Sequence, residues 1–94
     1  MNTPKVLFRV HAVQRMLERN ISVKAVLRAL QSGKPIEDYS AEMPEPSRLI
    51  LSFQGKRPFH VVMSENIEEN TTTIITVYKP DSARWDKDFM RRRS

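Results

Sequence analysis

The chain has 94 residues, which allows one small domain, and 16 lysines and arginines against 11 acidic residues give it a net charge of +5. The absence of cysteine excludes disulfides and thiolate metal sites, and two histidines cannot form an all-imidazole zinc site. No apolar run approaches the roughly 20 residues that a bilayer-spanning helix needs. We therefore expect a cytoplasmic domain that has no metal site, no cofactor and no membrane contact.

The positive charge is concentrated at the two ends of the chain. Residues 1–36 hold seven basic side chains and one acidic, residues 37–69 hold three and seven, and residues 70–94 hold six and three. Basic ends around an acidic middle indicate an anionic partner such as RNA, DNA or an acidic polypeptide. Lysine and arginine also solubilise helices, so the charge alone leaves that alternative open.

The chain opens with the pattern of a short strand followed by a helix. Residues 6–10 alternate between apolar and polar or basic side chains, as a strand does. From Val10 to Asn20 the pattern becomes helical, and Asn20 is a suitable helix stop. The side chains predicted to face the core have three- and four-residue spacing: Val10, Val13, Met16 and Leu17.

A second helix is predicted directly after the first. Ser22 is a suitable N-cap for a helix over residues 23–32, and Gly33 stands where a C-terminal glycine belongs. So short a connection between two helices predicts an angled helical hairpin. Its second helix is expected to bury Val23, Val26, Leu27 and Leu30.

The second half of the chain changes to alternation at every second residue. Three segments rich in β-branched and aromatic residues predict strands, and residues 36–39 predict a brief edge strand. Glycine, proline and asparagine mark a loop at 40–46 and turns at 55–57 and 66–70. The three predicted strands are residues 48–54, 59–65 and 72–79.

A short helix is predicted from about Ser82, after a proline that ends the last strand. It places Trp85 and Phe89 one turn apart, as an anchor to the core or, alternatively, as a stacking surface for nucleic acid. The element order predicts one α+β domain over residues 1–94. Its expected architecture is a helical hairpin followed by an antiparallel β-meander and a short C-terminal helix.

Alternation also assigns side chains to the two faces of the sheet. If Leu51 opposes Val61, the core face holds Leu49, Leu51, Phe53, Phe59, Val61 and Met63. The other face then collects Arg48, Ile50, Ser52, Gln54, His60, Val62 and Ser64, and we place Thr76 and Tyr78 there too. A histidine, a phenol and an arginine on one partly open face can move protons and hold a phosphate, although a hydrated polar face is the alternative.

Two further basic groups are candidates for phosphate binding. His11, Arg15, Glu18 and Arg19 share one face of the first helix, where His11 and Arg15 could bind a phosphate together. The alternative is a solvated face on which Glu18 pairs with a neighbouring arginine. The tail of Arg91, Arg92 and Arg93 either grips phosphates non-specifically or is a solvated terminus.

Three ordered blocks of sequence resemble one bacterial family. They are residues 11–22 (HAxxRMxxRxIS), residues 57–62 (RPFHVV) and residues 75–81 (ITVYKPD), the last followed by Trp85, Phe89, Arg92 and Arg93. The resemblance covers about residues 6–93. On these blocks the chain is identified as a member of the family called domain of unknown function 4258.

That family is similar in element order to the RelE/ParE-like toxins, including the BrnT branch. The resemblance therefore implies a RelE/ParE-like fold and the toxin of a bacterial type II toxin–antitoxin system, acting as a metal-independent endoribonuclease. In this interpretation His60 or His11 is the base on the ribose 2′-OH or the acid to the leaving oxygen, Arg15 and Arg57 neutralise the transition state, and Tyr78 stacks or donates a hydrogen bond. The basic residues expected to contact nucleic acid are Arg19, Arg48, Arg57, Arg91, Arg92 and Arg93.

The partners implied by the resemblance are RNA and a cognate antitoxin. The antitoxin would be an MqsA-like protein with a YgiT-type zinc finger or another DNA-binding protein. Because the ParE branch shows that the fold does not fix the reaction, an alternative stays open. That alternative is a non-catalytic protein- or nucleic-acid-binding domain in which both histidines are structural.

Overall fold

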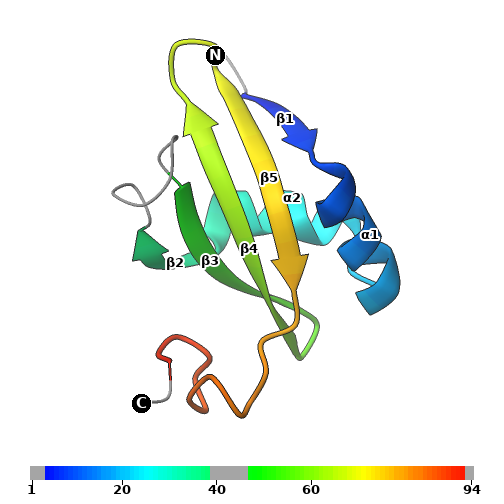
Figure 1. Ribbon diagram of the computed structural model, residues 1–94, viewed down its shortest axis with the longest axis vertical. Helices are drawn as coiled ribbons and strands as arrows, with labels where there is room; N and C mark the ends of the chain where they lie inside the picture. The colour runs from blue at the N-terminus through cyan, green and yellow to red at the C-terminus, as the bar shows by residue number, and fades with distance from the viewer. Residues whose placement is uncertain (1–3, 39–46, 93–94) are drawn as a thin grey trace.

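The computed structural model describes residues 4–38 and 47–92 and has an α+β fold (Figure 1). Five strands form one sheet in the order β1-β5-β4-β3-β2, and two helices lie on one of its faces. The elements are β1 (Lys5–Phe8), α1 (Val10–Arg19), α2 (Val23–Ser32), β2 (Lys34–Asp38), β3 (Ser47–Gln54), β4 (Arg57–Asn66) and β5 (Thr71–Tyr78). The predicted loop over 40–46, Tyr39 and Arg93 lie outside the described residues.

The sheet is mixed, whereas the sequence predicted an antiparallel one. Strands β2 to β5 form the expected antiparallel meander, but β1 pairs with β5 in parallel. After β1 the chain crosses the sheet through α1 and α2 to reach its far edge at β2. The meander then returns strand by strand, which brings β5 beside β1.

The predicted helix boundaries are confirmed. Asn20 ends α1 in the left-handed conformation with φ 57°, and the Ser22 hydroxyl caps α2 by accepting a hydrogen bond from the Ala25 backbone N–H at 3.0 Å. Gly33 ends α2 for a different reason than expected, since its φ of −69° is accessible to any residue. A Cβ at Gly33 would lie 2.5 Å from Ala29 O and from a methyl carbon of Ile50, so glycine is required by this close approach.

The register of the β3–β4 hairpin differs by one residue from the predicted one. A two-residue turn joins Gln54 to Arg57, so Leu51 opposes His60 and Ile50 opposes Val61. Because a one-residue shift exchanges the faces of a strand, Ile50 packs in the core beneath the helices. The predicted faces of β3 were therefore wrong, and these residues lie on the face opposite to the predicted one: Arg48, Leu49, Ile50, Leu51, Ser52, Phe53 and Gln54.

The pairing of β4 with β5 supports one face assignment and corrects another. His60 stands opposite Tyr78, as predicted. A register shift between Val62 and Met63 then changes the alternation on β5. Ile74 consequently turns into the core, where it is fully buried, although uninterrupted alternation from Tyr78 would place it on the face of His60.

The predicted C-terminal helix does not form. Residues 79–92 instead make a series of turns, with an isolated bridge between Trp85 and Arg92 (Figure 1, orange to red). The carboxylate of Asp81 accepts from the Ala83 N–H at 2.9 Å, and such local hydrogen bonds compete with helix formation. Trp85 is nevertheless buried and serves as the expected anchor, on the face of the sheet opposite the helices.

Candidate functional site

His60 lies at the centre of the sheet face that the helices leave open. Its side chain is fully buried, with 0% exposure, between Leu51 on β3 and Tyr78 on β5. The Nδ1 atom lies 3.2 Å from the Tyr78 hydroxyl oxygen, and the Nε2 atom lies 2.8 Å from the backbone oxygen of Phe89. Both ring nitrogens therefore have protein partners.

These contacts determine where the imidazole proton resides. A carbonyl oxygen can only accept, so Nε2 carries the proton and donates it to Phe89. Burial lowers the pKa of His60, while the hydrogen bond to Phe89 partly offsets that effect, and burial raises the pKa of Tyr78. His60 is thus neutral at pH 7, and its Nδ1 accepts the hydrogen bond of the Tyr78 hydroxyl.

The C-terminal segment closes this site from solvent. The Trp85 ring meets His60 edge-on at a centroid distance of 4.5 Å, and the Arg92 guanidinium lies 4.8 Å from the Trp85 centroid. Arg92 also donates to both carboxylate oxygens of Glu37 on β2, at 3.0 and 3.3 Å. Arg92 thus attaches the C-terminal segment to β2 at the edge of the sheet.

The two histidines lie in separate places. His11 is exposed on α1, on the helix side of the sheet, whereas His60 faces the opposite side. Arg15 is exposed on the same helix and donates to Glu18 at 3.0 Å. The predicted catalytic residues therefore form two pairs, His60 with Tyr78 and His11 with Arg15, that cannot act on one reacting bond.

Arg57 lies at the C-terminal end of α1 rather than beside His60. Its guanidinium donates to Asn20 O at 3.0 Å and to Arg19 O at 3.5 Å, which satisfies carbonyl groups that a helix end leaves without partners. A hollow of about 60 Å³ is present here, and three exposed cations line it: Arg19, Arg57 and Lys79. We call it the cationic hollow.

The remaining predicted nucleic-acid contacts are dispersed. Arg48 pairs with Glu65 across β3 and β4. Arg92 is held by Glu37, and Arg91 is exposed near it. Arg93 lies outside the described residues. Among the described residues of this set, Arg19 and Arg57 come together at the cationic hollow, and Arg91 and Arg92 are neighbours in the C-terminal segment.

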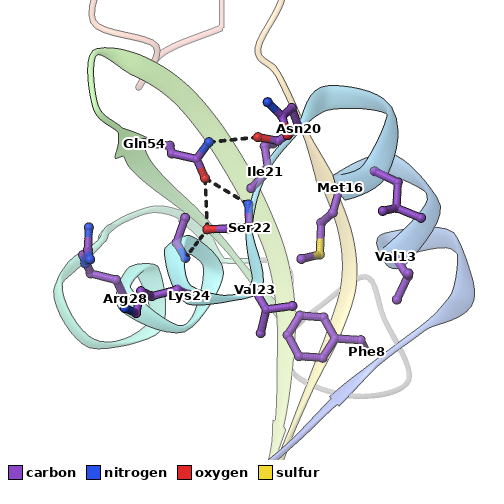
Figure 2. Close-up of a pocket in the computed structure, with 12 residues that line it drawn as sticks. Phe8, Val13, Met16, Asn20, Ile21, Ser22, Val23, Lys24, Arg28 and Gln54 are labelled. Atoms are coloured by element: carbon purple, nitrogen blue, oxygen red, sulfur yellow. Dashed lines mark hydrogen bonds between the residues drawn. The ribbon is translucent and has the colours of Figure 1, made fainter.

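A groove between α1 and α2 was not predicted from the sequence (Figure 2). The Gln54 side chain fixes its closed end, because its amide nitrogen donates to Asn20 O at 2.8 Å and its oxygen accepts from the Ser22 N–H at 2.9 Å and hydroxyl at 3.1 Å. The sequence signal that could have revealed this groove was the apolar stripe of α1, which is wider than the part of the helix that packs in the core. Leu17, placed in the core by its spacing, is 78% exposed.

Metal and membrane sites have no candidates in the part of the chain that the structure describes. No three His, Cys, Asp or Glu side chains within 4–38 and 47–92 are grouped so that they could hold a metal ion. Over the same residues, no helix has the length and apolar character needed to cross a membrane.

Comparison with known proteins adds one finding. No curated protein and no solved structure matches the chain. One family model matches residues 8–79, and its description is Domain of unknown function (DUF4258). This region contains both helices, the whole meander and the last residue of β1, Phe8, and two of the three sequence blocks that carry the resemblance lie entirely within it. The chain therefore belongs to the DUF4258 family.

Proposed function

We propose that this protein binds RNA in the bacterial cytoplasm through the cationic hollow. The observation that carries the proposal is the grouping of Arg19, Arg57 and Lys79 around one depression. All three are exposed, no acidic residue lines the hollow, and no ion pair engages any of them within the described residues. Three uncompensated cations in one place attract a polyanion.

The hollow is also organised before any ligand arrives. The carbonyl groups at the end of α1 hold the Arg57 guanidinium, so less side-chain entropy is lost when a phosphate binds. The same carbonyls form the negative end of the α1 helix dipole, which favours cations there. RNA is the polyanion that the resemblance to RelE/ParE-like toxins implies.

The salt dependence of binding tests this proposal. Affinity for a fluorescent single-stranded RNA is measured by anisotropy across a salt series, because each neutralised phosphate contributes about 0.7 to the slope of log K against log salt. We expect the double variant Arg19→Ala/Lys79→Ala to lower the slope by about 1.4. The matched control is Lys5→Ala, an exposed cation at the opposite end of the sheet, which should leave the slope unchanged. An unchanged slope in the double variant would refute the role of the hollow.

Ribonuclease activity as a type II toxin is a second candidate, and exposed His11 supports it. Arg15, one turn further along α1, could hold the phosphate next to the imidazole. RNA is incubated with the protein in EDTA, and His11→Ala is expected to lower cleavage by about 10²–10⁴-fold. Cleavage that survives His11→Ala would exclude this residue as acid or base.

A toxin of this kind would be neutralised by an antitoxin encoded beside it. The test is growth arrest on induction, with co-expression of the neighbouring small zinc-finger or DNA-binding protein. Relief of arrest would support the RelE/ParE-like interpretation. Normal growth of the induced strain, with the protein accumulating in folded form, would leave RNA binding without cleavage as the better account.

A further inference from the structure

We propose that the groove between α1 and α2 binds an acidic amphipathic helix from a protein partner. The groove has a volume of about 610 Å³ and lies between Val13 and Met16 on α1 and Val23 on α2, with Phe8 of β1 at its base (Figure 2). Its apolar side chains are open to solvent, since Leu17 is 78% and Val23 is 53% exposed. Their burial by a partner removes apolar surface from water.

A second hollow lies next to the groove, along α2. It has a volume of about 550 Å³ and shares Phe8 with the first. Leu27 and Leu30 line it from α2, and together with Val23 they follow the i, i+4, i+7 spacing of one helix face. Two neighbouring apolar depressions beside one helix fit an elongated occupant with its own apolar stripe, as in helix-in-groove recognition.

Side-chain hydrogen bonds hold the connection between the two helices. Gln54 bonds to both Asn20 and Ser22, and Ser22 caps α2, so the connection between the helices has a fixed geometry (Figure 2). The groove is consequently present without a ligand, which reduces the ordering cost of binding.

The charged side chains that line the groove indicate which kind of partner it binds. Lys24 and Arg28 stand one helical turn apart among the residues that line the groove, both exposed and without an ion-pair partner within the described residues. No acidic side chain lines the hollow of about 610 Å³, and Glu65, which lines the second hollow, is paired with Arg48. A helix with carboxylates beside its apolar stripe complements this lining, whereas two copies of this chain related by a two-fold axis would bring the same cations together.

The experiment uses the whole protein and a designed peptide of about 18 residues, or five helical turns, with leucines along one face and glutamates on both flanks. Binding is followed by isotope-edited NMR and calorimetry. We expect saturable binding with shifts confined to the groove. A scrambled peptide of identical composition is expected not to bind, because its leucines no longer form one face.

Matched variants locate the site. Leu17→Asp is expected to weaken binding at least tenfold, whereas Ile67→Asp, an 88% exposed apolar residue in the β4–β5 turn, should change it less than about twofold. Lys24→Glu/Arg28→Glu is expected to cause a similar loss, and Lys87→Glu in the C-terminal segment should not. A peptide with lysines in place of glutamates should bind the double variant better than it binds the natural protein. Thermal melting verifies that each variant is folded.

Any one of four results would overturn the proposal. Two concern the peptides: the acidic peptide fails to bind, or the scrambled peptide binds equally well. The other two concern different occupants: the protein self-associates and Leu17→Asp abolishes this, or it binds anionic vesicles in a way that depends on Leu17. Loss of RNA binding in Leu17→Asp would also overturn it by making the groove part of the RNA surface. Failure of the peptide experiment alone leaves RNA binding at Arg19, Arg57 and Lys79 unaffected, so the two proposals fail separately.

Discussion

Replacing His60 with phenylalanine tests whether the buried histidine stabilises the fold. The substitution keeps a ring against Trp85 and Tyr78 but removes both hydrogen bonds. The Phe89 carbonyl loses its 2.8 Å donor, and the half-buried Tyr78 hydroxyl loses its 3.2 Å acceptor. His60→Phe is therefore expected to destabilise the protein without changing its shape.

The size of the effect follows from those two hydrogen bonds. Leaving the part-buried Phe89 carbonyl without its donor costs about 1–2 kcal/mol, and the loss of the acceptor of the part-buried Tyr78 hydroxyl costs about 1 kcal/mol. The total, about 2–3 kcal/mol, corresponds to a fall in Tm of roughly 10–20 °C for a domain of this size.

The pH dependence distinguishes His60 from a generic core residue. Because burial lowers the pKa of His60 below its ordinary value of 6.5, the unfolded chain binds more protons than the folded one as the pH falls below 6.5. The stability that neutral His60 contributes is thus present above pH 6.5 and is lost as the pH falls through its lower folded pKa. The natural protein should be less stable at about pH 5.5 than at about pH 7.5, before most carboxylates titrate.

Urea denaturation at those two pH values is the assay. His60→Phe should lose most of the pH dependence, and His11→Ala, at an exposed position, should retain it. A His60→Phe protein with unchanged stability, or with the natural pH dependence of stability, would refute the inference that His60 is buried and neutral. Once folded, this variant should still bind RNA with its natural salt dependence, because the cationic hollow does not include His60.

Two further predictions concern the helix ends. Ser22→Ala removes the cap of α2 and a hydrogen bond to Gln54, and we expect a loss of about 1–2 kcal/mol by urea denaturation, with Ser22→Thr much closer to the natural protein. Gly33→Ala places a methyl group 2.5 Å from a carbonyl oxygen and a methyl carbon, and we expect a loss of about 1–3 kcal/mol. Gly55→Ala meets nothing within 4 Å and is strained only by its φ of 65°, so its loss should be smaller. The reverse order for the two glycines would contradict the packing argument.

The helices were predictable because their signals are local. Asn20 and Ser22 act on hydrogen bonds within three or four residues of themselves, so the sequence contains the whole cause. The strands form where the alternating pattern predicted them. Which side chains of β3 face the core, however, depends on the length of the turn between β3 and β4. A loop of two residues at 55–56 instead of three shifted the register by one and moved Gln54 from the predicted histidine face to the helix connection.

The C-terminal segment was not predictable from periodicity because its contacts are distant in sequence. Trp85 and Phe89 have helical spacing, yet Phe89 adopts φ 59° and its carbonyl bonds to His60 on another element. Arg92 pairs with Glu37 on the far edge of the sheet. Such long-range contacts outweigh the weak propensity of a short helix.

The same contacts bear on the chemistry that the sequence pattern suggested for the sheet face of His60. His60 and Tyr78 are residue types that catalysis uses, but in this fold both ring nitrogens of His60 and the Tyr78 hydroxyl have hydrogen-bond partners within the protein. Leu17 and Lys24, in contrast, face solvent without a partner among the described residues. The closed face therefore accounts for the fold, and the groove and cationic hollow are where function should be sought.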